Sequence, residues 1–134
     1  MDGIVYGVVV SLGFATFENY DYVFRLAETW DIDPAQMAIW RSYSAVPMHG
    51  LNGCIMGFYF GMYAFTSDKK YLIFSLLMPF LLHGFYNFLG HPVHLLVVIG
   101  MLAYAIVLHS NLKKLQLKKK IENENLKIWK KNLF

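Results

Sequence analysis

Charged residues are scarce in this 134-residue chain. Aspartate, glutamate, lysine and arginine together make up 16% of it, whereas soluble domains carry about 25%. Hydrophobic residues reach 57% and aromatic residues 17%, above the roughly 45–50% apolar content of soluble domains. This composition argues against an ordinary soluble domain and indicates a membrane protein. The length of the chain is enough for one small domain.

Cysteine is almost absent as well. Cys54 is the single one, which excludes an internal disulfide framework, and we interpret it as a packing residue. The first residues lack a basic segment and a clear small-residue cleavage site, so no signal peptide is predicted. No low-complexity segment and no convincing repeat is present.

The basic charge is concentrated at one end of the chain. Residues 111–134 contain eight lysines and two glutamates, a net charge of +6, while the first 110 residues contain four basic and seven acidic residues, a net charge of −3. After an apolar chain, such a tail predicts contact with anionic lipid or solvent, and we expect no nucleic-acid partner. We therefore expect a membrane domain over 1–110 and a basic, partly amphipathic cytoplasmic tail over 111–134. The tail fits an amphipathic helix, a frayed helix or a disordered segment.

Four apolar stretches cover about 4–26, 37–65, 72–89 and 93–110. A membrane-spanning helix needs about 20 mostly apolar residues, so the sequence predicts an all-α, polytopic transmembrane bundle with about four spanning helices. The connector over 27–36 has three acids and no base, and Pro34 suits a helix start. The connector over 66–70 carries Lys69 and Lys70, and 90–92 reads as a turn. The positive-inside rule then places both chain ends in the cytoplasm.

Ionisable residues occur inside these apolar stretches. Each costs about 2.5–3.5 kcal/mol on insertion scales and therefore usually faces a partner or a cavity. At ~1.5 Å per helical residue, Glu18, His49 and His83 lie roughly 12, 18 and 9 Å from the outer ends of their helices. The three side chains are therefore predicted to meet in the outer half of the bilayer. There are two alternatives: Glu18 is a residue at the membrane–water interface, or His83 is a core histidine whose ring nitrogens have hydrogen-bond partners. We expect His91, His94 and His109 to be interfacial residues at helix ends, not ligands.

The helical spacing of small and polar residues supports this convergence. On the second stretch, residues spaced four apart form one stripe along the helix: Arg41, Ala45, His49, Gly53, Gly57 and Gly61. The small residues predict a packing seam, with the polar Arg41 and His49 at its outer end. A similar face of the first stretch carries Gly7, Ser11, Ala15 and Glu18. In the third, His83 and Asn87 point the same way, and Pro79 predicts a local kink.

One glutamate and two histidines allow two kinds of hydrolytic chemistry. They can hold a divalent metal such as zinc, with a water in the open position. Alternatively, the glutamate acts as a general base without metal, while histidine and asparagine donate hydrogen bonds to the developing oxyanion. A transporter or a proton relay would also use buried glutamate and histidine.

Three ordered motifs resemble the PrsW family of membrane proteases, which is related to the CAAX-protease and bacteriocin-processing membrane enzymes. They lie in "DGIVYGVVVSLGFATFEN", "RSYSAVPMHGLNGCIMGFYFG" and "HGFYN", and the likeness extends from Asp2 to about Asn87. The F-A-x-x-E-N element is matched by Phe14, Ala15, Glu18 and Asn19. The histidine of the next element is matched by His49, with Arg41 upstream and Gly57 downstream, and the H-x-x-x-N element is matched by His83 and Asn87.

The resemblance implies a helical peptidase of the bacterial inner membrane that cuts a membrane-anchored substrate such as an anti-sigma factor. Glu18, His49 and His83 are the expected catalytic residues and the possible zinc ligands. Asn19 and Asn87 are expected to orient water or the substrate carbonyl. Arg41 is expected to pair with Glu18 or with another acid, in a structural or substrate-binding role.

One family motif, the paired glutamate E-E-x-x-K, is missing from this sequence. It is expected on an earlier helix, upstream of "DGIVYG". We therefore interpret the chain as the C-terminal part of a larger domain, with Met1 an internal methionine, and expect little activity from it alone. A catalytically inactive membrane binding module and a small ion or proton transporter are the alternatives.

Overall fold

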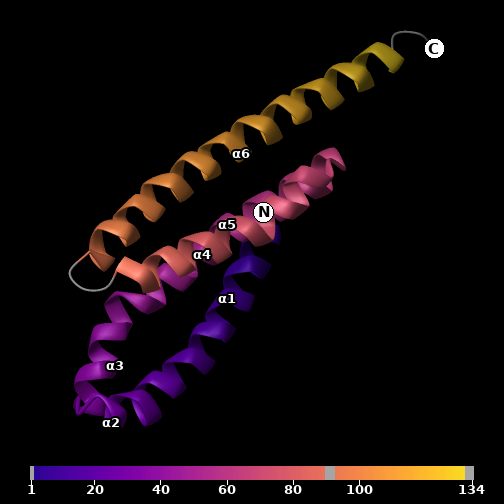
Figure 1. Cartoon of the computed structure of the whole chain (residues 1–134). Helices are drawn as coiled ribbons and strands as arrows, with labels where there is room; N and C mark the ends of the chain where they lie inside the picture. The colour runs from indigo at the N-terminus through magenta and orange to yellow at the C-terminus, as the bar shows by residue number, and fades with distance from the viewer. Residues whose placement is uncertain (1, 90–92, 132–134) are drawn as a thin grey trace.

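The structure is a computed structural model that describes residues 2–89 and 93–131, nearly all of them helical (Figure 1). The elements are α1 (Asp2–Asp21), the π-helical turn η1 (Tyr22–Leu26), α2 (Ala27–Thr29), α3 (Pro34–Tyr43), α4 (Ala45–Thr66), α5 (Lys69–Leu89) and α6 (His94–Lys131). The predicted all-α fold is confirmed. The predicted turn at 90–92, with His91, lies outside the described residues.

Helix α4 is the centre of the bundle. It packs against α1, α5 and α6, whereas α1 and α5 touch each other little within the described residues. In Figure 1, α1 diverges from α4 toward one end of the bundle, where η1, α2 and α3 complete the connection between them. That end therefore holds the widest separation of α1 and α4 (Figure 1).

Glycines let α1 and α4 pack with their backbones in contact. A Cβ added to Gly7 would lie 2.3 Å from the carbonyl oxygen of Gly53, and one added to Gly57 would lie 2.3 Å from that of Gly3. Real Cβ atoms do not approach a carbonyl so closely, and small residues are what allow such helix crossings in membranes. Ser11 Oγ also donates a hydrogen bond of 2.6 Å to the His49 carbonyl oxygen. The predicted packing seam is therefore present.

The second apolar stretch, predicted as one segment over 37–65, is divided into two helices. Helix α3 ends at Tyr43, Ser44 adopts φ −115° and ψ −68°, and α4 begins at Ala45. Pro47 explains the division, because its ring clashes with the carbonyl of the residue four positions earlier, Tyr43, and it has no N–H to bond there. The predicted helix start at Pro34 is confirmed: Asp33 caps α3 by accepting hydrogen bonds from the amides of Ala35 and Gln36 at 2.6 and 3.2 Å.

Buried apolar residues hold α4, α5 and α6 together. The core contains Met48, Ile55, Phe58, Met62, Tyr86, Met101, Leu108 and Leu112. The hydroxyl groups of Tyr59 on α4 and Tyr104 on α6 are hydrogen-bonded to each other. Helix α5 stays helical through Pro79, so His83 and Asn87 project from one continuous element.

Two helices of the described residues, α5 and α6, are long and apolar enough to cross a membrane. Helices α1 and α4 have 20 and 22 residues, which is also sufficient length for a bilayer core of about 30 Å. Both carry polar residues that lower their hydropathy, Glu18 and Asn19 on α1 and His49 and Asn52 on α4.

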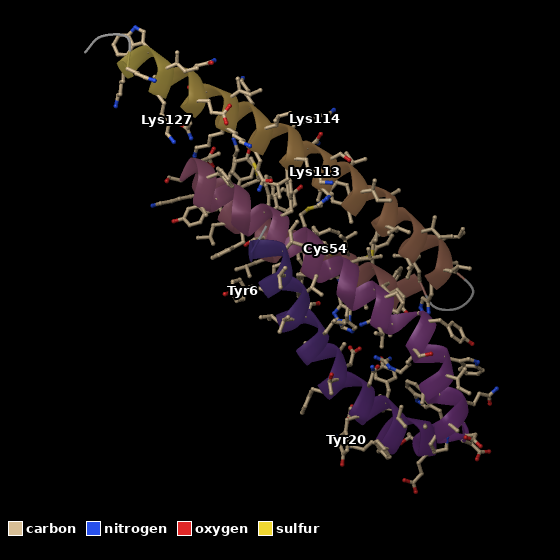
Figure 2. All side chains as sticks on the ribbon, turned by 180° about the vertical axis from the view of Figure 1, so that it is seen from behind. Tyr6, Tyr20, Cys54, Lys113, Lys114 and Lys127 are labelled. Atoms are coloured by element: carbon tan, nitrogen blue, oxygen red, sulfur yellow. The ribbon has the colours of Figure 1, made fainter. Side chains whose placement is uncertain are left out.

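The basic tail continues α6 instead of forming a separate element. The 38 residues of α6 correspond to about 57 Å, nearly twice the ~30 Å bilayer core. Its second half reaches past the ends of α4 and α5 (Figure 1) and carries Lys127, with Lys113 and Lys114 nearer the bundle (Figure 2). The expectation that His109 marks a helix end is therefore wrong, whereas His94 does begin α6.

Candidate active site

Glu18 of α1, His49 of α4 and His83 of α5 meet at the end of the bundle where α1 leaves α4. His49 Nε2 lies 3.0 Å from Glu18 Oε2, and His83 Nε2 lies 3.4 Å from Glu18 Oε1. One carboxylate oxygen and one nitrogen of each imidazole all lie within 4.8 Å of one another. Side-chain exposures are 17% for Glu18, 3% for His49 and 23% for His83. The sequence-predicted trio thus forms one compact, partly buried cluster.

The local sequence explains why these side chains converge. Gly53 lies one turn after His49, and its contact with Gly7 fixes the distance between α1 and α4. Glu18 lies about three turns beyond Gly7, and 11 residues bring it back to nearly the same face of α1. His83 reaches the cluster from α5, which packs on another side of α4. Three helices therefore supply one titratable group each.

Arg41 of α3 compensates the charge of Glu18. Its Nη2 donates a hydrogen bond of 2.5 Å to Glu18 Oε2, and its Nε donates one of 2.6 Å to Asn19 Oδ1. The Tyr22 ring covers the guanidinium group, with 3.7 Å from Cζ to the ring centroid. This structural pairing agrees with the expectation for Arg41. Asn19, by contrast, uses its amide oxygen on Arg41, so it orients the arginine.

Asn87 lies beside His83, one turn further along α5. Its Nδ2 is 3.4 Å from His83 Nε2, and its side chain is exposed. An amide at this place is available to hydrogen-bond a group that enters the site. Cys54 is half-buried with a free thiol, and among the residues that the structure describes no contact is found between it and the cluster.

Phe14 and Tyr22 belong to the site although their roles were not deduced from the sequence. Phe14 packs against both imidazoles, with ring centroids 5.7 Å from His49 and 6.0 Å from His83. The two imidazoles are 5.0 Å apart. Phe14 and Tyr22 each lie four residues from Glu18, on either side, and residues at this spacing share a helix face. That spacing is the sequence signal that points to them.

The donor set suits a zinc ion. One carboxylate and two imidazoles form a known set for catalytic zinc, which keeps its fourth position open for water. Ligands at about 2.0–2.1 Å around a tetrahedral ion lie roughly 3.4 Å from one another. His83 Nε2 lies 3.4 Å from Glu18 Oε1, and one ligand atom of each of the three residues lies within 4.8 Å of the others. Arg41 engages Oε2 of Glu18, so Oε1 is the carboxylate oxygen best placed for a metal. The residues present therefore fit the metal chemistry.

A helical bundle with a carboxylate–bis-histidine cluster in its polar end fits the class of membrane-embedded metal-dependent hydrolases. The comparison with known proteins gives the family. The sequence model of the "PrsW family intramembrane metalloprotease" matches residues 1–110. This chain belongs to the PrsW family of intramembrane metalloproteases.

Curated relatives carry the description "Protease PrsW". The protein from Clostridioides difficile is 34% identical over 138 residues, which cover 99% of this chain and 56% of the relative. Those from Bacillus subtilis and Geobacillus kaustophilus are each 46% identical, over 66% of this chain and 38% and 37% of their own lengths. The chain thus spans about half, or less, of the curated relatives it matches. No solved structure is detectably similar to it.

Proposed function

We propose that this chain carries the zinc-binding site of a PrsW-type peptidase that hydrolyses a peptide bond of a membrane-anchored protein. The observation that carries the proposal is the convergence of Glu18, His49 and His83, whose ligand atoms lie within 4.8 Å of one another. Family membership supports both the class of reaction and the use of a metal. It also implies a membrane protein as substrate.

Each residue of the site has a definable task. Glu18 Oε1, His49 Nε2 and His83 Nε2 would hold the zinc ion. Bound zinc supplies Lewis-acid polarisation of a carbonyl group and lowers the pKa of a coordinated water. Arg41 pairs with Glu18 and fixes its orientation through Oε2, and Asn19 in turn holds Arg41. Asn87 donates a hydrogen bond to the carbonyl oxygen of the bound substrate.

Proton transfer requires a further base. General acid–base groups contribute about 10²–10⁴-fold to rates, and Glu18 is already engaged by Arg41 and both histidines. The remaining acids of the described connectors, Asp31, Asp33 and Asp68, lie outside the cluster. We propose that the paired glutamates of the family's E-E-x-x-K motif supply this base, so that the chain alone cleaves slowly.

The cellular setting follows from the same proposal. The enzyme would reside in the bacterial inner membrane as a multi-pass protein, with its site in the outer half of the bilayer. Its substrate would be a membrane-anchored protein such as an anti-sigma factor, as the resemblance to the family implies. The basic end of α6 would lie in the cytoplasm.

The test is zinc binding together with cleavage, in purified protein reconstituted in detergent. The chain should bind one zinc ion, and Glu18→Gln, His49→Ala and His83→Ala should each lose it, while His109→Ala should retain it. Joined to a segment bearing E-E-x-x-K, the chain should cleave a transmembrane peptide, and the same three variants should not. Unchanged zinc binding in all three variants would overturn the metal site, and unchanged cleavage would overturn the catalytic role.

A further inference from the structure

A cavity adjoins the candidate active site on the side of Arg41. It has a volume of about 270 Å³ and is enclosed by η1, the connector between α2 and α3, α3 itself, and the facing ends of α5 and α6. Four aromatic side chains line it, Tyr22, Trp30, Trp40 and Tyr86, together with the apolar Ile32 and Met37 and the polar Arg41, Ser44, Asn87 and His94. None of these residues is needed to hold the metal.

We infer that this cavity is a specificity pocket that accepts one large apolar side chain of the substrate, adjacent to the bond that is cut. The inference rests on the proposed function, because it assumes that a peptide binds at Glu18, His49 and His83.

The size of the cavity fits one side chain. A volume of 270 Å³ corresponds to roughly nine water molecules at about 30 Å³ each, and sites for whole small molecules begin near ~300 Å³. Met37 and Tyr86 form a buried floor with exposures of 6% and 4%, and Trp30 stands half-exposed at the rim. A cavity with a closed floor and an open rim suits a group that enters from one direction.

The walls of the cavity are held in place by their own contacts. The Tyr86 ring stacks on His94, with 4.1 Å between centroids and an interplanar angle of 20°. The rings of Tyr22 and Trp30 meet edge to face at 5.8 Å. Preformed aromatic walls reduce the ordering cost of binding, so a fitting side chain gains affinity from burial.

The cavity and the zinc-ligand cluster are separated only by residues that contact both. Arg41, which lines it, is bonded to Glu18, and Asn87, which also lines it, lies 3.4 Å from His83 Nε2. Successive Cα atoms of a peptide are about 3.8 Å apart. A substrate carbonyl held at the cluster therefore places the side chain of the same or the next residue at the cavity mouth.

The chemistry of the lining selects an apolar group over an acidic one. Arg41 also lines the cavity, but its Nη2 is already bonded to the Glu18 carboxylate, its Nε to Asn19, and its face is covered by Tyr22. An acidic side chain would therefore bring a second carboxylate to a cation that Glu18 already neutralises. Phenylalanine, tryptophan, leucine or methionine would instead pack on the aromatic rings without breaking a hydrogen bond.

Two of the three tryptophans of the chain line the cavity, so fluorescence reports its occupancy directly. The third, Trp129, lies near the far end of α6 and is removed as Trp129→Phe. The probe is a series of single-spanning peptides, each with one 4-bromophenylalanine. The position of this residue shifts by one from peptide to peptide through the outer quarter of the membrane span. Each peptide is reconstituted with the full chain in liposomes. Because bromine quenches tryptophan on contact, quenching should peak at one or two adjacent peptide positions.

A competition experiment tests the predicted selectivity. The same peptide with phenylalanine at the peak position should displace the probe, and the one with aspartate there should compete about tenfold more weakly. Ile32→Phe, which narrows the cavity, should weaken peptide binding about tenfold. Ile39→Phe, the same substitution at an exposed position of α3 outside the cavity, should leave binding unchanged.

The outcomes separate this inference from the proposed function. Quenching that is uniform along the peptide, or equal displacement by the aspartate peptide, would overturn the pocket even if zinc binds and the peptide is cleaved. A peaked quench without zinc binding would overturn the metal site and leave the pocket standing. Loss of all peptide binding in the unaltered chain would overturn both.

Discussion

Arg41 Nη2 lies 2.5 Å from Glu18 Oε2, and the two side chains are only 10% and 17% exposed. Removing one member of a largely buried pair leaves an uncompensated charge, at a cost of about 3–5 kcal/mol. Arg41→Met should therefore lower the free energy of unfolding by about 3 kcal/mol, and adding Glu18→Gln should restore most of it. Denaturant unfolding in mixed micelles measures both.

The exposed pair Arg25–Asp21 provides the matched control. Its atoms are 2.7 Å apart, but the side chains are 76% and 36% exposed, and such pairs contribute about 0.3–0.5 kcal/mol. Arg25→Met should consequently have little effect. Equal losses for the two arginine variants would contradict the charge-compensating role of Arg41.

Zinc should stabilise the fold through the three-helix cluster. A ligand that binds only the folded state adds about 2.7 kcal/mol at 100 times its dissociation constant. Zinc should therefore raise the unfolding temperature of the chain, and a chelator should reverse the rise. His83→Ala should abolish the shift while His109→Ala keeps it; a shift that survives His83→Ala would place the metal elsewhere.

The contact of α1 with α4 should tolerate no side chain at Gly57. A Cβ there would lie 2.3 Å from the Gly3 carbonyl oxygen, and overpacking costs about 1–3 kcal/mol. Gly57→Ala should reduce the unfolding free energy by that amount and also weaken zinc binding, because Glu18 moves with α1. Gly61→Ala, on the same stripe but with no atom within 4 Å of its added Cβ, should be neutral or slightly stabilising.

Phe14 should influence the metal site without contacting the metal. Its ring packs on both imidazoles, and groups that orient metal ligands typically change affinity by about 10–100-fold. Phe14→Ala should weaken zinc binding at least tenfold in a competition titration with a fluorescent chelator. Phe17→Ala, at a 75% exposed position, is the control and should bind as the unaltered chain does.

The end of α6 should lie in the cytoplasm. Eight lysines after residue 110 and the positive-inside rule support this orientation. A cytoplasm-active reporter joined at the end of the chain should be active, and one that matures only outside the inner membrane should be silent. The opposite pattern would invert the topology and place the site in the inner half of the bilayer.

Much of the site follows from helix geometry alone. A rise of ~1.5 Å per residue sets the depth of each side chain, and four-residue spacing sets its face. These two rules predict that Glu18, His49 and His83 meet, although the depth of His49 was counted along one uninterrupted helix and the structure divides that stretch at Ser44. The order of the three motifs indicates the protein family. Both the cluster and the family of the chain could therefore be predicted from the sequence.

Other features depend on contacts that periodicity does not encode. The end of α3 at Tyr43 results from the ring of Pro47 four residues later, which a search for apolar stretches does not register. Helix α6 extends through the basic tail because lysine, leucine and glutamate have good helix propensity and the preceding turns are already formed. Ring packing by Phe14 and Tyr22 requires the relative placement of α1, α3, α4 and α5, which no single stretch specifies.

The unbroken course of α6 has a practical consequence for imaging this small protein. A rigid marker domain joined in helical register at Lys131 would inherit the orientation of the membrane helix, because no flexible joint is described between His94 and Lys131. The overhang of about 27 Å beyond the bilayer core would keep such a marker clear of the detergent belt. A 15.5 kDa membrane protein would thereby gain the size and asymmetric shape that single-particle alignment requires.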